Sequence, residues 1–290
     1  MAAKKRKTKK TASKKTTAKK KVAKKTTKKK AAKRATKKTA TRSSNRESTD
    51  LERQVAAPGR DDLIKQVREK INELGITYIY YQFISVTGRI VGKGIPADHW
   101  ERTAERGFQL VYGSTANLFI DRHGDYIGYG PEAMELVGIP DPETFCQLPW
   151  DKRVARVFCT CYRNREERNN PGAALTSDCR GNLKRFHREF KNKYKMDFRV
   201  GTEPEMMWLK RGEDGKPDGG FSNPYCYHID QFESLRPVFM QVIEYCNAMG
   251  LDMIQGDHED APGQLELNWT FDDVCAIPIV CLPIVKYAHR

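Results

Sequence analysis

The first 46 residues are the feature that most limits what this chain can fold into. They contain 18 Lys and four Arg, no acidic residue precedes Glu47, and the only sizeable apolar residue after the initial Met is Val22. A segment of this composition cannot bury enough apolar surface to offset the entropy lost on ordering, so we expect disorder over residues 1–46. A folded core must therefore come from the residues that follow.

The basic tail also hides the charge of the rest of the chain. The formal net charge is +15, yet the 244 residues after Arg46 hold 30 Lys and Arg against 37 Asp and Glu, a net −7. Such a tail predicts non-specific binding to nucleic acid or another polyanion, with a steep dependence on salt. A solvating tail without a partner is the alternative.

The chain from Asp61 onward is long enough for one large or two small domains. It has no apolar run of membrane-spanning length, so no membrane partner is expected. Its eight Cys show no C-x-x-C spacing, and no secretory signal precedes them, which favours reduced thiols and a cytoplasmic location. Cys159 and Cys161, in "VFCTCY", are expected on a strand as buried structural thiols.

Hydrophobic spacing predicts an α+β organisation in two regions, residues 61–165 and 166–290, after a tail and linker at 1–60. The first region is expected to hold a helix over 60–76 with apolar residues at helical spacing and Gly75 at its end, then a hairpin, a short helix from Ala97 and a strand at 153–162. The turn-rich stretch at 170–183 marks the boundary. For the second region we expect helices at 182–194, 231–250 and 272–290, and strands at 197–210, 251–259 and 264–271.

Carboxylates are concentrated in two short stretches of the second region. In "GTEPE", Glu203 and Glu205 are two residues apart, so on a strand both point to one face. In "DHEDAPGQLELNW", Glu259 and Glu266 flank a Pro-Gly turn that would fold one against the other. Bare carboxylates about 6 Å apart repel by roughly 3 kcal/mol at an effective dielectric of 20. Oxygen-only ligands favour Mg²⁺ or Mn²⁺ as the compensating cation. Solvated charges on a sheet surface are the structural alternative.

These two stretches resemble motifs of the glutamine synthetase family. "GTEPEMMW" is similar to the family's G-x-E-x-E strand, and "DHEDAPGQLEL" is similar to its H-H-E-x-A-x-G-Q-x-E motif. The segments "GIPDPETFCQLPWDKRVARVFCTCY" and "SDCRGNLKR" extend the resemblance in order and spacing. It covers residues 77 to 290.

The resemblance implies a small β-grasp domain followed by the first part of the family's catalytic domain, with an antiparallel sheet. It implies that Glu205, Glu259 and Glu266 hold one metal ion and that Glu203 contributes to a second. ATP would phosphorylate the γ-carboxylate of glutamate, and ammonia or an organic amine would displace phosphate. Phe271 falls where the family places an aromatic near the adenine, although a core aromatic is an equally good interpretation. A ring-type homo-oligomer is also implied.

Two departures from the family pattern change the expectation. Ser85 stands where the family usually has the Asp that binds ammonium, which favours an organic amine because a hydroxyl is a poor base near neutrality. The family's catalytic Glu and Arg residues belong to a part beyond position 290. We therefore expect an amino-terminal fragment and assign the activity to the complete enzyme.

Two rival functions stay open. The first is an inactive half-enzyme that acts in binding or assembly through its Lys-rich tail. The second is a carboxylate-metal phosphoesterase, in which the flanking L-P-W and D-x-R segments would have no role.

Overall fold

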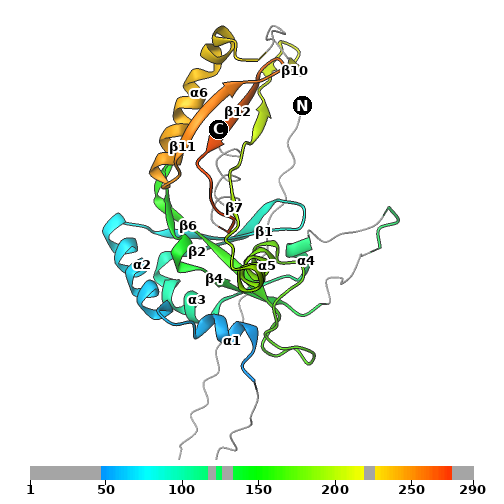
Figure 1. Cartoon of the computed structure of the whole chain (residues 1–290). Helices are drawn as coiled ribbons and strands as arrows, with labels where there is room; N and C mark the ends of the chain where they lie inside the picture. The colour runs from blue at the N-terminus through cyan, green and yellow to red at the C-terminus, as the bar shows by residue number, and fades with distance from the viewer. Residues whose placement is uncertain (1–46, 117–121, 126–132, 219–225, 276–290) are drawn as a thin grey trace, which may run out of the picture. The chain divides into compact units, whose positions relative to one another are not determined.

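A six-stranded mixed sheet forms the centre of the first region (Figure 1). Its order is β2-β1-β6-β4-β3, with β5 also paired to β6. The pairing of β1 with β6 is parallel, and the other pairings are antiparallel. The strands are β1 Tyr78–Ile84, β2 Ile90–Pro96, β3 Phe108–Leu110, β4 Leu136–Pro140, β5 Cys146–Leu148 and β6 Asp151–Tyr162.

Two helices cover one face of this sheet. The predicted amphipathic helix is α2, Arg60–Leu74, and it ends at Gly75, which adopts the left-handed conformation. The short helix expected from Ala97 is α3, Trp100–Arg106, preceded by a 3-10 turn at Ala97–His99. Trp100 is fully buried, and its ring N–H donates to the Ile64 carbonyl over 2.9 Å. Cys159 and Cys161 are also fully buried in β6, as predicted.

The structure, a computed structural model, describes residues 47–116, 122–125, 133–218 and 226–275. The basic tail lies outside them. Helix α1, Asp50–Val55, falls within the stretch expected to be linker. Thr49 and Glu52 form its capping box, and Leu51 is 1% exposed against Val137, Ile139 and Tyr162. Residues 49–55 therefore belong to the folded body, to which Leu51 and the hydrogen bond from the Ala174 N–H to Asp50 Oδ2 attach them.

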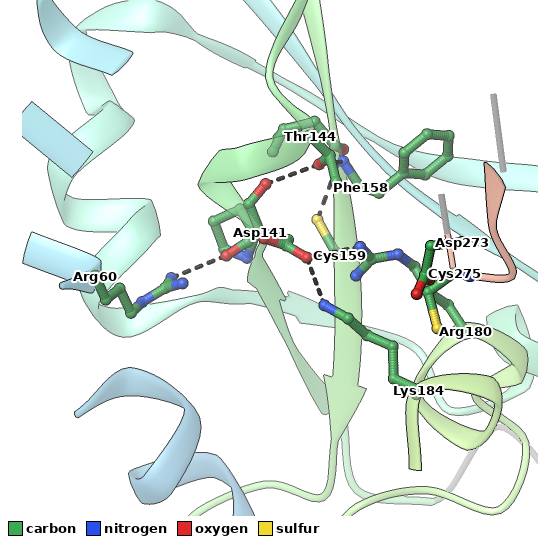
Figure 2. Close-up of polar contacts among 12 residues, drawn as sticks. Arg60, Asp141, Thr144, Phe158, Cys159, Arg180, Lys184, Asp273 and Cys275 are labelled. Atoms are coloured by element: carbon green, nitrogen blue, oxygen red, sulfur yellow. Dashed lines mark hydrogen bonds and ion pairs between the residues drawn. The ribbon is translucent and has the colours of Figure 1, made fainter. Parts of the chain in front are cut away.

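A buried ion network fixes the second face of the large sheet. Asp141 follows β4, and its carboxylate accepts from Arg180 over 2.6 Å and from Lys184 over 2.8 Å. Both basic residues come from α5, Cys179–Tyr194, as Figure 2 shows. Asp178 caps α5 by accepting from the Gly181 N–H, and its other oxygen accepts from the Cys161 N–H of β6. These contacts attach α5 to the sheet.

The second region contains a separate three-stranded antiparallel sheet, β11-β12-β8, with α6 beside it (Figure 1). The bounds are β8 Glu205–Met207, α6 Ile229–Ala248, β11 Met253–His258 and β12 Gln264–Trp269. Phe239, Val242 and Cys246 of α6 pack against Leu267 and Trp269 of β12. This apolar side of the sheet leaves the opposite side free for polar residues.

The α+β class is confirmed, and two predicted elements differ. The strand expected at 197–210 is broken into β7 Arg199–Val200, β8, and β9 Lys210–Arg211, which pairs with β10 Pro217–Asp218. The helix expected at 272–290 is wrong at its start, because Asp272–Asp273 forms β13, which pairs with β7. Its remainder, 276–290, lies outside the described residues. The β-grasp name and the division near residue 165 stay predictions.

No described helix has the length and apolar character that crossing a membrane would require. The seven Cys among the described residues are free thiols.

Candidate metal centre

A row of three carboxylates crosses the small sheet. Strand register places Glu266 of β12 directly opposite Asp257 of β11 and directly opposite Glu205 of β8. Residues that face each other across neighbouring strands project to the same side, with Cβ atoms about 4.5–5.5 Å apart. The structure therefore brings Glu205 and Glu266 together as predicted.

Glu203 lies one row along the same face. The exposed and half-buried residues alternate from Gly201 to Met207, so Glu203 and Glu205 project to the same side. The Leu267 N–H donates to the Pro204 carbonyl and the Trp269 N–H donates to the Thr202 carbonyl, which sets Glu203 beside Asn268. The predicted side-by-side placement of Glu203 and Glu205 is present.

Glu259 follows β11 directly and continues the carboxylate face. Its N–H donates to the Gln264 carbonyl over 2.9 Å, so the turn at 260–263 sets it two residues along the ladder from the Asp257–Glu266 pair. Burial raises the pKa of the Glu259 carboxyl, and the negative charges of Glu266 and Glu205 raise it further. The Pro-Gly turn thus aims the Glu259 carboxylate at Glu266, as expected from the sequence.

The four glutamates share a face without forming a closed cage. Among the described residues, these glutamates do not form a group in which one carboxylate oxygen from each lies within 4.8 Å of the others. Their donor set is all oxygen, and the negative charges of Glu266 and Glu205 add to the effect of burial in raising the pKa of Glu259. Both properties suit a hard divalent cation such as Mg²⁺ or Mn²⁺, which would draw the side chains together.

Three polar residues of this face were missed in the sequence. Asp257 completes the carboxylate row. Asn268 donates to Glu266 Oε1 over 2.5 Å, and Gln264 donates to Glu205 Oε2 over 2.7 Å. The two amides therefore hold two of the candidate ligands in place. Alternation could have identified all three residues, because Gln264, Glu266 and Asn268 are spaced by two, as are Asp257 and Glu259.

Phe271 lies just beyond β12 and is not a core residue. Its side chain is 57% exposed, and the Arg199 guanidinium lies 4.6 Å from the ring centroid. The two residues line a cavity of about 290 Å³ together with Leu251 and Trp269. The core interpretation of Phe271 is wrong, and its adenine contact stays a prediction.

Ser85 directly follows β1 and begins the hairpin turn. The residue is 0% exposed, its Oγ accepts from the Arg89 N–H over 3.2 Å, and it lies 3.2 Å from Thr87 Oγ1. Within this chain the hydroxyl serves the turn. A role in selecting the amine stays a prediction.

Sequence comparison places this face in a known family. The family description "Glutamine synthetase, catalytic domain" matches residues 176–277. A glutamine synthetase of Staphylococcus aureus (strain Mu50) is 27% identical over 225 residues, 74% of this chain and 46% of the relative. That of Methanococcus voltae is 29% identical over 207 residues, 70% of this chain and 44% of the relative. The chain thus spans about half the length of these curated relatives.

Solved structures share the fold. GmaS in complex with ADP aligns over 77% of this chain and 49% of its own, at 24% identity and a TM-score of 0.63. A Plasmodium falciparum glutamine synthetase aligns over 79% of this chain and 48% of its own, at 15% identity and a TM-score of 0.59. The carboxylate face, the motif spacing and the catalytic-domain match agree, and together they support membership of the glutamine synthetase family.

Proposed function

We propose that the carboxylate face takes part in ATP-dependent ligation of glutamate with ammonia or an organic amine through a γ-glutamyl phosphate. The observation that carries the proposal is the carboxylate row across β11, β12 and β8, with Glu259 beside it. A solved neighbour, GmaS, is described as a complex with ADP, which supports a nucleotide substrate.

Each group on the face has a stated task in this reaction. Glu205, Glu259 and Glu266 would hold one divalent cation and Glu203 would contribute to a second, while Gln264 and Asn268 orient the carboxylates. Bound cations would neutralise the ATP phosphates, which is the main requirement of phosphoryl transfer. A γ-carboxylate oxygen of glutamate attacks the γ-phosphorus and ADP leaves. The amine then attacks the acyl carbon, phosphate leaves, and the amine loses a proton.

Glutamate-dependent phosphate release from ATP tests the reaction. We expect it to require Mg²⁺ or Mn²⁺ and to be lost in Glu266→Ala, with Glu244→Ala, an exposed change on α6, as the matched control. Because the chain spans about half the length of its curated relatives, the assay is run on this 290-residue chain and on the longest protein that contains it. Full activity of a metal-replete Glu266→Ala enzyme would overturn the assignment.

The Lys-rich tail supports a second candidate function, polyanion binding. Its 18 Lys and four Arg predict that residues 1–46 bind duplex DNA with an affinity that collapses between low and physiological salt. Deleting these residues should abolish binding, because the rest of the chain carries a net −7. Salt-insensitive binding, or none, would leave the solvating role.

A further inference from the structure

We propose a second metal site, selective for Zn²⁺, formed by His187, Asp273 and Cys275. One ligand atom from each of these residues lies within 4.8 Å of the other two. The site is separate from the carboxylate face in residues and in ligand chemistry. Its existence does not depend on the proposed ligase function.

Secondary structure brings the three side chains together from two distant segments. His187 projects from α5, and its side chain is 10% exposed. Asp273 ends β13, and Cys275 follows two residues later. Asp273 Oδ1 accepts from the Cys275 N–H over 2.7 Å, so the D-x-C turn is fixed by its own hydrogen bond. Figure 2 shows Asp273 and Cys275 together beside Arg180.

Two of the three ligand separations lie close to those of tetrahedral zinc. Bond lengths of about 2.3 Å to sulfur and about 2.05 Å to nitrogen and oxygen require about 3.6 Å between S and N and about 3.3 Å between N and O. Cys275 Sγ lies 3.8 Å from His187 Nδ1, and Asp273 Oδ2 lies 3.5 Å from the same nitrogen. These two pairs need to close by only a few tenths of an ångström, and the third pair, the Cys275 sulfur and an Asp273 oxygen, lies within 4.8 Å.

Charge and ligand type select the ion. A thiolate and a carboxylate would balance the two positive charges of the ion, and nearby Arg180 and Lys184 are already paired with Asp141. The soft sulfur and the imidazole favour zinc over Mg²⁺ and Ca²⁺, which prefer oxygen. His187 and Cys275 also line a cavity of about 810 Å³, which leaves room for water at a fourth position.

Binding must change the hydrogen bonding of the imidazole. His187 Nε2 accepts from the Phe198 N–H over 3.2 Å, so the neutral ring carries its proton on Nδ1. Coordination through Nδ1 moves that proton to Nε2 and breaks the Phe198 contact. The N–H formed at Nε2 then needs an acceptor. Asp197 Oδ1 lies 4.0 Å from Nε2 and is paired with Lys191 over 2.6 Å, so it can accept this hydrogen bond. A carboxylate behind a ligating histidine is the usual outer-shell partner of zinc.

Cobalt substitution tests the site by a signal specific to sulfur. The full chain titrated with Co²⁺ in excess Mg²⁺ should develop sulfur-to-cobalt charge-transfer absorption, which equimolar Zn²⁺ removes. Carboxylates give no such band, and the tail contains neither Cys nor His. Cys275→Ser should eliminate the band, whereas Cys146→Ser, a change at another half-buried thiol, should retain it.

Two further measurements test the site without relying on the folding of the Cys275→Ser variant. In the unmodified chain, Zn²⁺ should protect Cys275 from alkylation, as followed by mass spectrometry. Asp197→Asn should weaken Zn²⁺ binding by about 10- to 100-fold, the usual loss for an outer-shell partner, without removing the band. Absence of the band in the unmodified chain, or its persistence in Cys275→Ser, would overturn the proposal.

Discussion

Glu266→Gln should make the metal-free chain more stable. Glu266 faces Asp257 on one side and Glu205 on the other, with Cβ atoms about 5 Å apart. At the dielectric of water, two charges about 5 Å apart repel by about 0.8 kcal/mol, so neutralising the middle carboxylate removes at most about 1.6 kcal/mol. A glutamine oxygen can still accept from Asn268, so the packing of the row is kept.

The same substitution should remove stabilisation by metal. A ligand that binds only the folded state at 100 times its Kd adds about 2.7 kcal/mol to the free energy of unfolding. Glu266→Gln takes a charged ligand from the centre of the row, so Mn²⁺ should stabilise the unmodified chain and have little effect on the variant. The order of stability of the two proteins should therefore reverse when Mn²⁺ is added.

Urea unfolding with and without Mn²⁺ measures both effects. Glu244→Gln, an exposed carboxylate on α6, provides the control and should change neither value appreciably. If the metal-free Glu266→Gln chain is less stable than the unmodified chain, the carboxylates do not repel across the row. If Mn²⁺ stabilises both proteins equally, the metal does not bind at Glu266.

Two other predictions concern the large sheet. Asp141→Asn should cost about 3–5 kcal/mol in urea unfolding, because it leaves Arg180 buried without its partner. Burial acts to raise the pKa of Asp141, but Arg180 and Lys184 outweigh it and hold the pKa below its usual range. The stabilisation is therefore full above the unfolded pKa of about 3.9 and is lost as the pH falls through the folded pKa. An Asp141→Asn chain with the same acid transition as the unmodified chain would contradict this. In an active ligase, Ser85→Asp should shift preference from an organic amine towards ammonia, and an unchanged ratio of kcat/KM values would limit Ser85 to its role in the turn.

The sequence predicted the structure well where hydrophobic periodicity coincided with a residue that ends a helix or forms a turn. Helix α2 has apolar residues at helical spacing and Gly75 at its end, and it was predicted within a residue or two at either end. The Pro-Gly turn between Glu259 and Glu266 predicted that the two flanking strands fold against each other, as β11 and β12 do. In both cases local chemistry and the final packing agree, which is the condition for a reliable prediction.

The errors arose where tertiary contacts decided the outcome. Helix α1 is only six residues long, and its position depends on Leu51 reaching a distant cluster, which periodicity does not reveal. Asp272 and Asp273 were expected to open a helix, yet pairing with β7 draws them into a strand. His187 lies 86 and 88 positions before Asp273 and Cys275, so sequence spacing could not have suggested that the three side chains meet.

Gly256 connects the packing of the small sheet to its carboxylate face. It lies between Gln255 and Asp257 on β11, opposite Leu267. A Cβ atom at this position would lie 1.9 Å from Cε2 of Phe239, an α6 residue that is only 7% exposed. The ring has little room to retreat, so Gly256→Ala must push β11 away from the helix.

We expect Gly256→Ala to cost about 1–3 kcal/mol through overpacking. It should also weaken Mn²⁺ binding, because β11 carries Asp257 and leads into Glu259, and both would move relative to Glu266. Adding Phe239→Leu returns space to the strand, so the double variant should regain Mn²⁺ affinity even where its stability stays below that of the unmodified chain. Recovery of Mn²⁺ affinity without full recovery of stability would distinguish a displaced site from a fold that is only less stable. Unchanged Mn²⁺ affinity in Gly256→Ala would show that the position of β11 does not set the geometry of the metal face.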